Sequence, residues 1–244
     1  MLIDSLKNKQ TILASFLQIS AMSGWNLKNL EEALDLVNID KKYLSIIFPN
    51  GILDVIDFYI KEGNKELAKK ISYIEDFDQQ KIRDKIRLCL YKRFEIEINN
   101  KKSVNNLVHF YFDPKNLSSF STGLRPSFQS LELCFSISDS IWKIIKDQST
   151  DFNFYSKRLI LSKIIWKTSS IFINDESENL TNTKKYIDNE IKKIMQFEKF
   201  KFKIKNQFST FFQSAHDIIM EDNGSLKQAK EVVKNLPFIR LLRK

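Results

Sequence analysis

The side chains that most often carry catalysis are few in this chain of 244 residues, and they do not form a recognisable constellation. The two histidines, His109 and His216, have no cysteine, histidine or carboxylate at metal-ligand spacing. No glycine-rich phosphate loop, G-x-S-x-G or C-x-x-C motif occurs. The neighbouring carboxylates Asp175, Glu176 and Glu178 could bind a cation, or they could begin a helix, where negative charge suits the dipole. The sequence therefore predicts a protein that is not an enzyme, with no cofactor and no metal.

The two cysteines, Cys89 and Cys134, lie far apart in the sequence and on apolar helical faces. Buried free thiols are common on such faces, and disulfides are rare in reducing compartments. We therefore expect two free thiols in a cytosolic protein. The first residues, Met-Leu-Ile-Asp-Ser-Leu-Lys, match neither a signal peptide nor a transit peptide, which favours a bacterial cytoplasm over a mitochondrial precursor.

Aromatic residues and lysines are interleaved between Phe197 and Phe212. The aromatic residues recur at steps of three and four, so they share one helical face, and the lysines lie mostly off that face. This pattern is typical of a helix on an anionic membrane surface, although a helix packed on its own core can show it too. The net charge of +9 agrees with an acidic partner. The expected membrane contacts, including a weaker repeat in the tail, are Phe197, Lys199, Phe200, Lys203, Phe208, Phe211, Phe238 and Leu242.

The segment from Asp147 to Arg158 opens a long and very apolar helix, which we expect to begin at Asp151 after a cap at Ser149 or Thr150. Beyond it, polar residues form only a narrow stripe along one helical face, made of Ser156, Lys163, Lys167, Ser170 and Asn174. A helix that is apolar nearly all round is either wrapped by other helices or lines an apolar cavity.

Long periodic runs with only five glycines and four prolines predict an all-α fold. The run from Gln79 to Ile98 carries one arginine, Arg93, within its apolar set. No run of about 18 apolar residues occurs, so no membrane span is expected. The expected helices cover residues 4–22, 26–37, 41–48, 52–74, 79–98, 103–112, 128–146, 151–173 and 180–220, followed by a basic tail helix from Ser225, and the clearest loop covers residues 116–126.

The first three of these helices have the shape of a helix-turn-helix. Lys41, Lys42 and Tyr43 could reach bases and phosphates, but the apolar Leu44, Ile46 and Ile47 leave a thin reading surface. We divide the chain into a degenerate helix-turn-helix subdomain (1–50), a helical core (51–220) and a basic amphipathic tail helix (221–244).

Several segments resemble the TetR-like lipid-binding accessory proteins of ubiquinone (coenzyme Q) biosynthesis. The resemblance lies in Phe-Pro-Asn-Gly after the third helix, Asp-Pro-Lys-Asn before the loop, Asp139-Ser-Ile-Trp142, the signature Asp147-Gln-Ser-Thr-Asp-Phe-Asn-Phe-Tyr-Ser-Lys-Arg158, and Asp175-Glu-Ser. It fades over residues 60–100 and over roughly the last 40 residues.

The resemblance implies a TetR-like all-α fold without enzymatic activity. Such a protein binds an isoprenoid, a quinone intermediate or a phospholipid in an apolar pocket and presents the intermediate to the membrane-associated di-iron hydroxylase of the pathway. It implies a peripheral protein of the cytoplasmic face of the bacterial inner membrane, a homodimer, and no nucleic-acid partner. The residues that would line the pocket here are Trp142, Phe152, Leu159, Leu161, Ile165, Trp166 and Phe172.

The family's partner-docking patch falls on the signature. In this chain it corresponds to Asp151, Phe154 and Tyr155, with Asp139 and Arg158 nearby, and Phe154 stands where many relatives carry tryptophan. The alternative is that Tyr155 and Phe152 are core residues and that Arg158 is an intramolecular partner. Two other functional classes remain open, a ligand-responsive DNA-binding regulator of the TetR type and a purely structural helix bundle.

Overall fold

The computed structural model describes residues 5–112 and 126–197, and these residues form helices and no strand. The predicted all-α class is therefore confirmed. Short 3-10 turns at Lys41–Tyr43, Phe77–Gln79, Ile98–Asn100 and Glu178–Leu180 precede four of the helices. The helices are α1 (Ser5–Ser23), α2 (Leu27–Leu36), α3 (Leu44–Ile47), α4 (Ile52–Ser72), α5 (Ile82–Ile96), α6 (Lys101–Phe112), α8 (Pro126–Ile144), α9 (Asp151–Phe172) and α10 (Thr181–Phe197).

The helix ends follow the capping residues in the sequence. Asn26 caps α2 by accepting a hydrogen bond from the Asn29 N–H at 2.9 Å, and Asp40 accepts one from the Lys42 N–H at 2.9 Å. Gly24 ends α1 with a φ of +85°, a conformation that favours glycine. Two predicted starts were three residues early: the helices expected from Lys41 and Gln79 begin at Leu44 and Ile82, because Lys41–Tyr43 and Phe77–Gln79 form separate 3-10 turns. Two others, expected from residues 103 and 128, begin two residues earlier, at Lys101 and Pro126.

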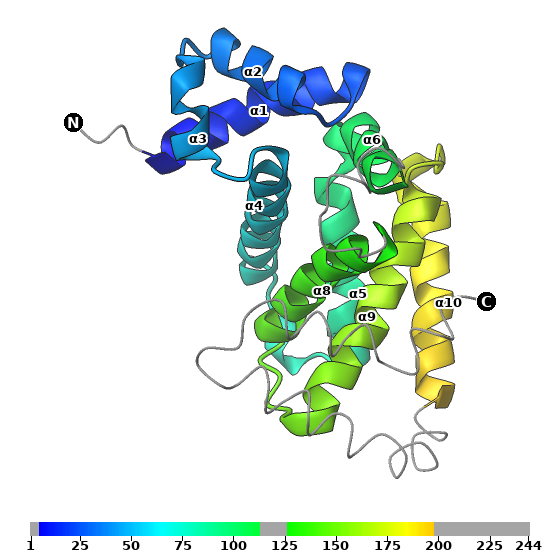
Figure 1. Cartoon of the computed structure of the whole chain (residues 1–244). Helices are drawn as coiled ribbons and strands as arrows, with labels where there is room; N and C mark the ends of the chain where they lie inside the picture. The colour runs from blue at the N-terminus through cyan, green and yellow to red at the C-terminus, as the bar shows by residue number, and fades with distance from the viewer. Residues whose placement is uncertain (1–4, 113–125, 198–244) are drawn as a thin grey trace.

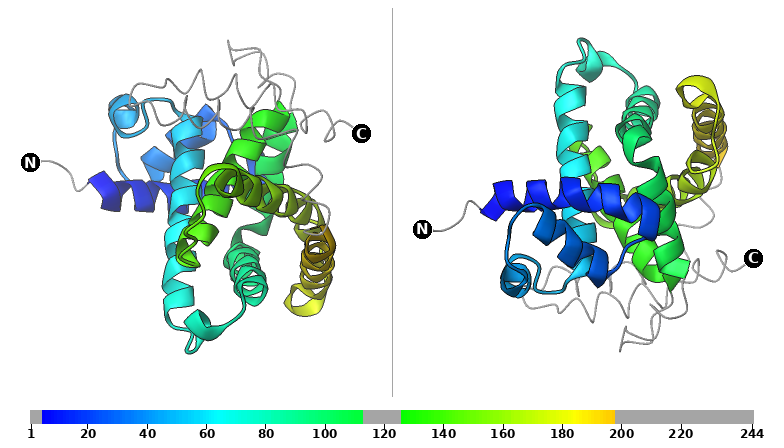
Figure 2. Two further views of the ribbon diagram at one scale, coloured as in Figure 1. Left: turned by 90° about the horizontal axis from the view of Figure 1, so that it is seen from below. Right: turned by 90° about the horizontal axis from the view of Figure 1, so that it is seen from above.

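The long helices form a bundle, with α1–α3 across one end (Figure 1). Helix α9 packs between α8 and α10, α8 also contacts α4 and α6, and α5 contacts α4 and α10. Seen along the bundle, α1 lies across the end between α4 and α6 (Figure 2). The exposed positions of α9 include Lys163, Lys167 and Ser170 from its predicted polar stripe, so the apolar remainder faces the bundle as expected.

The N-terminal helices are tied to the bundle through Trp25. Its indole N–H donates to the Ser103 carbonyl at 2.9 Å, and its ring lies 5.7 Å from the ring of Tyr59 on α4. The Ser20 and Ser103 hydroxyls lie 2.6 Å apart, which joins α1 to α6. These contacts place the first three helices against the end of the cavity described below. That this arrangement is TetR-like remains a prediction.

The charges of the first 50 residues do not favour DNA binding. The segment carries five lysines and five acidic residues, so its formal net charge is zero. Lys41 pairs with Asp35 at 3.0 Å, and Lys42 pairs with Asp40 at 2.9 Å. A DNA-binding surface needs surplus positive charge to neutralise phosphates, so the regulator alternative gains no support here.

Several predictions fall outside the described residues. They concern most of the loop at 116–126, the continuation of the last helix beyond Phe197, the tail helix at 221–244, and every membrane-contact residue except Phe197, of which only the backbone is described. Within residues 5–112 and 126–197, no single helix is long and apolar enough to cross a membrane; one bent pair, Lys41–Ile47 with Ile52–Ser72, passes by length and composition alone.

Candidate functional site

A cavity of about 80 Å³ lies where α4, α5, α6, α8 and α9 meet. Its wall is largely apolar, because each helix turns one apolar face toward the same space. The lining residues are Tyr59 and Ile60 from α4, Arg93 and Phe94 from α5 with Glu97 just beyond it, Val104, Leu107, Val108 and Tyr111 from α6, Leu133, Cys134 and Ile137 from α8, and Ile165, Trp166, Ser169 and Phe172 from α9.

The cavity is small for a lipid. Pockets that enclose drug-sized ligands usually measure about 300–1,000 Å³, whereas 80 Å³ has room for only a few waters. A lipid tail could enter only if lining side chains moved apart. As described, the cavity is too small to enclose a lipid tail.

The structure separates the predicted pocket residues into two groups. Ile165, Trp166 and Phe172 line the cavity, as α9 passes along it. Trp142, Leu159 and Leu161 are also buried, but they lie elsewhere in the core, and the Phe152 side chain is outside the described residues. Helix α9 thus both fills the core and lines a cavity, the two alternatives left open by its sequence. That the cavity holds a lipid remains a prediction.

A hydrogen-bonded group of three buried side chains, Tyr59, Arg93 and Glu97, interrupts the apolar wall. Tyr59 donates its hydroxyl to one oxygen of Glu97, and Arg93 donates Nη1–H to the other oxygen. The arginine is only 4% exposed, and its Nε–H has no acceptor among the described residues. An unmet buried donor costs about 1–3 kcal/mol, so this group is an exception that needs a physical reason.

A glycine on α4 makes room for this arginine. A Cβ at Gly63 would lie 2.7 Å from Arg93 Nη2 and 3.0 Å from Cζ, closer than side chains normally approach. Glycine inside a helix is less favourable than alanine by about 1 kcal/mol. The presence of Gly63 in the middle of α4 is explained by the guanidinium group that lies against it.

Burial determines the protonation of the other groups near the cavity. Desolvation, with the nearby Glu97 charge, raises the pKa of Tyr59 well above its usual value, so the phenol stays neutral. Burial also raises the pKa of the Cys89 and Cys134 thiols to about 12. Both cysteines are free and buried, as predicted, and they stay protonated and poorly nucleophilic at neutral pH.

Sequence reasoning did not select Tyr59, Arg93 or Glu97 as site residues. Two signals were available: Arg93 lies in the apolar set of its helix, one turn after Cys89, and Glu97 follows it at i+4. Neither signal reveals Gly63 or Tyr59, which belong to another helix.

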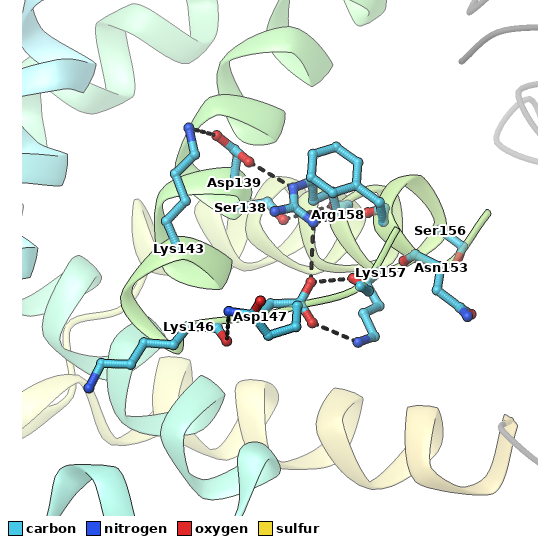
Figure 3. Close-up of polar contacts among 12 residues, drawn as sticks. Ser138, Asp139, Lys143, Lys146, Asp147, Asn153, Ser156, Lys157 and Arg158 are labelled. Atoms are coloured by element: carbon cyan, nitrogen blue, oxygen red, sulfur yellow. Dashed lines mark hydrogen bonds and ion pairs between the residues drawn. The ribbon is translucent and has the colours of Figure 1, made fainter. Parts of the chain in front are cut away.

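The signature segment forms a second buried ion cluster, at the junction of α8 and α9 (Figure 3). Arg158 is 2% exposed and lies between two aspartates: its Nε is 2.7 Å from Asp139, and its Nη1 is 3.4 Å from Asp147. Lys143 pairs with Asp139 at 2.7 Å, and Lys157 pairs with Asp147 at 2.8 Å. Every charge in the cluster therefore has an opposite charge beside it.

Hydrogen bonds and stacking complete this cluster. The Arg158 guanidinium carbon lies 3.4 Å from the centre of the Phe154 ring, and Nη1 also donates to the Phe154 carbonyl at 3.2 Å. The Ser138 hydroxyl on α8 donates to the Arg158 carbonyl at 2.9 Å. Ser149, a candidate cap of α9, instead donates its hydroxyl to Asp147, and Thr150 occupies the N-cap position. The signature thus closes the turn between α8 and α9.

Both aspartates are held in the charged form. Burial alone would raise the pKa of Asp139, but the hydrogen bonds from Lys143 and Arg158 outweigh it and lower that pKa. Burial likewise opposes the charge on Asp147, and the hydrogen bonds from Lys157 and Ser149 outweigh it, so its pKa is lowered too.

Most of the predicted docking residues with described side chains face inward. Arg158 is an intramolecular partner, Asp139 is bound to it, and Tyr155 is 8% exposed with its ring 5.0 Å from that of Phe154. Phe154 is half-buried, and the Asp151 side chain is outside the described residues. Docking of a partner at these positions stays a prediction.

Asp175, from the last matching segment, organises the start of α10. One carboxylate oxygen accepts hydrogen bonds from the Ser177 N–H and hydroxyl, and the other accepts them from the Thr183 N–H and hydroxyl. These bonds outweigh the effect of burial and hold the pKa of Asp175 well below its usual range. Because both carboxylate oxygens bond to Ser177 and Thr183, Asp175 has the helix-start role that the sequence offered as one alternative.

Comparison with known proteins shows a family match in the helices that form the Arg158 cluster and one wall of the cavity. Residues 128–198, which span nearly all of α8 through α10, match the family model COQ9. The chain is COQ9-like. It is similar to the probable ubiquinone biosynthesis protein coq9, mitochondrial, of Dictyostelium discoideum, with 23% identity over 198 residues, or 79% of this chain and 61% of that protein.

Similar matches extend to animals. The ubiquinone biosynthesis protein COQ9-A, mitochondrial, of Xenopus laevis is 23% identical over 77% of this chain and 57% of its own length. The ubiquinone biosynthesis protein COQ9, mitochondrial, of Homo sapiens is 24% identical over 75% of this chain and 56% of its own length. The COQ9-like chain therefore spans less than two thirds of these relatives. All three are named as mitochondrial, so they do not support the predicted bacterial location.

Proposed function

We propose that the COQ9-like chain is a non-catalytic accessory protein of ubiquinone biosynthesis. It holds an isoprenoid, a quinone intermediate or another lipid in the cavity beside α9 and presents it to the membrane-associated di-iron hydroxylase of the pathway. The observation that carries this proposal is the position of the COQ9 match: α8 and α9, which lie within it, form one wall of the apolar cavity. The named relatives supply the pathway.

Apolar burial provides the driving force for binding. Removing apolar surface from water is favourable by about 25 cal/mol per Å², so a tail of several isoprene units would gain many kcal/mol in a dry cavity. Part of that free energy would widen the cavity. We expect the half-buried side chains of its wall to move first; they are Val104, Val108, Leu133, Trp166 and Ser169.

The charge of the C-terminal segment bears on where the protein works. Residues 198–244 carry ten basic and five acidic side chains, a formal surplus of +5 that suits an anionic membrane surface. We propose peripheral membrane association through this segment and assembly as a homodimer, on the inner face of a bacterial inner membrane or in the mitochondrial matrix.

The first test is mass spectrometry of the organic extract from gently purified protein. A stoichiometric isoprenoid, quinone precursor or phospholipid is the expected result. An empty extract from well-folded protein, together with no uptake of added lipid, would contradict the carrier function. A salt-sensitive shift of a DNA duplex would instead favour the regulator alternative.

A test of hydroxylase docking needs a variant that remains folded. Tyr155→Ala was expected from the sequence to fold normally, but a ring only 8% exposed leaves a cavity when truncated, and we expect a loss of about 3–5 kcal/mol. Phe154→Leu, at the half-buried neighbour, is therefore the better probe. Weaker hydroxylase association is expected, with a smaller loss of stability than in Tyr155→Ala, because leucine keeps part of the packing on Arg158. Unchanged association would contradict docking at Phe154.

A further inference from the structure

The polar groups in the cavity wall are nearly all occupied. The Glu97 carboxylate accepts from Tyr59 and Arg93, so the phenol has used its donor and both carboxylate oxygens are bonded. The Ser169 hydroxyl donates to the Ile165 carbonyl at 2.9 Å. Among the fully buried nitrogen and oxygen atoms that the structure describes in this wall, Arg93 Nε is the one without a hydrogen-bond partner.

We propose that Arg93 anchors the ligand of this cavity by donating Nε–H to a neutral oxygen on the ligand. The inference rests on the proposed function and specifies its ligand as a molecule with an apolar body and a carbonyl, ether or similar acceptor at one end. Arg93 is then a specificity-determining residue, because it distinguishes such a molecule from a plain hydrocarbon.

The arrangement is built around the guanidinium group. Gly63 leaves the space that Nη2 and Cζ occupy, since a Cβ there would lie 2.7 Å and 3.0 Å from them. Glu97, one turn after Arg93 and 6% exposed, holds Nη1 and turns the group into a neutral ion pair. A buried ion pair of this kind is often no more stabilising than apolar residues of the same size, so stability alone does not explain it.

Charge balance decides which oxygen fits. Because Glu97 already neutralises Arg93, an anionic ligand would be repelled by the Glu97 carboxylate and would compete with it. A neutral acceptor satisfies the Nε–H without adding charge. In this structure Nε is fully buried, so a ligand reaches it only as the lining side chains move apart. A carbonyl oxygen then supplies the missing acceptor, whereas a hydrocarbon does not.

Three ring compounds of nearly equal size test the proposal: acetophenone with a neutral carbonyl, isopropylbenzene with no acceptor, and benzoate with a charge. The measurement is a titration of the full chain followed by the NMR signal of the Trp166 indole, which lies in the cavity wall. Each affinity is corrected for the free energy of moving the compound from water to an apolar solvent. One hydrogen bond is worth about tenfold in affinity, so on this corrected scale we expect acetophenone to bind about tenfold more tightly than isopropylbenzene and more tightly than benzoate.

A variant links this preference to the polar group. Tyr59→Phe/Arg93→Met/Glu97→Leu removes all three partners together, which leaves no unpaired charge, and its fold is checked by circular dichroism. The preference for acetophenone should disappear in this variant. Arg87→Met, on the outer side of the same helix where Arg87 pairs with Asp188 at 2.8 Å, is the matched control and should keep it.

The outcomes separate the two proposals. Equal binding of acetophenone and isopropylbenzene by the parent protein would overturn the anchor and leave the carrier function standing. Tighter binding of benzoate, or a preference that survives in the triple variant, would also overturn it. Binding of none of the three compounds, together with an empty lipid extract, would overturn both.

Discussion

Arg158 and Arg93 are both buried in the helical bundle, but their guanidinium groups are satisfied in different ways. Arg158 faces two aspartates, a backbone carbonyl and an aromatic ring. Arg93 faces one glutamate, lines a cavity, and keeps one N–H without an acceptor among the described residues. The charge of Arg158 is explained by partners within the fold, whereas the buried Arg93 donor without a partner needs another explanation, for which we propose a ligand.

Truncation of the satisfied arginine should have the largest effect on stability. Arg158→Leu leaves Asp147, whose side chain is 6% exposed, with only Lys157 as a cationic partner. Breaking a buried ion pair from one side typically costs about 3–5 kcal/mol. Urea unfolding monitored by circular dichroism measures this change. A loss below about 1 kcal/mol would show that the signature cluster is not needed for the fold.

The substitution Gly63→Ala should change the free energy of unfolding in opposite directions in two backgrounds. In the parent protein, Gly63→Ala places Cβ against the Arg93 guanidinium, and overpacking of this kind costs about 1–3 kcal/mol. In the triple variant Tyr59→Phe/Arg93→Met/Glu97→Leu the flexible methionine can yield, and alanine should stabilise α4 by up to about 1 kcal/mol. Chemical denaturation of the parent protein and the triple variant, each with glycine or alanine at position 63, measures both changes. A stability change of the same sign in both backgrounds would contradict the packing of Arg93 on Gly63.

Acid should weaken the Arg158 cluster. Asp139 and Asp147 have lowered pKa values in the folded state, so their stabilisation is fully present above the usual aspartate pKa of about 4 and is lost as the pH falls through the lower folded values. The urea midpoint should therefore fall progressively below about pH 4. Asp147→Asn should reduce this pH dependence. An identical pH profile in that variant would show that protonation of Asp147 does not cause the loss of stability in acid.

The outermost ion pair should contribute least. The Lys143 side chain is 72% exposed where it meets Asp139, so Lys143→Ala should change stability by less than about 1 kcal/mol. The same unfolding assay compares it with Arg158→Leu. A loss as large as that of Arg158→Leu would mean that the cluster depends on its surface lysine, and the contrast between buried and exposed partners would fail.

Local features of the sequence predicted much of the fold. The caps at Asn26 and Asp40, the end of α1 at Gly24 and the apolar circumference of α9 each act within a few residues, and each appears as expected. The candidate site was predicted less well. Ile165, Trp166 and Phe172 line the cavity, but Trp142, Leu159 and Leu161 lie elsewhere in the core, because helical periodicity shows that a residue is buried without showing against which neighbour.

By itself, the sequence determined the helical class, the helix ends, the free cysteines and the COQ9-like signature. Only the tertiary structure decided that Arg158 meets Asp139 and Asp147, 19 and 11 residues away, and that Arg93 lies against Gly63 on another helix. Helix formation depends on interactions over three or four residues, so it can be read along the chain. The partners of a buried charge depend on how whole helices pack, and that packing is absent from any single stretch of sequence.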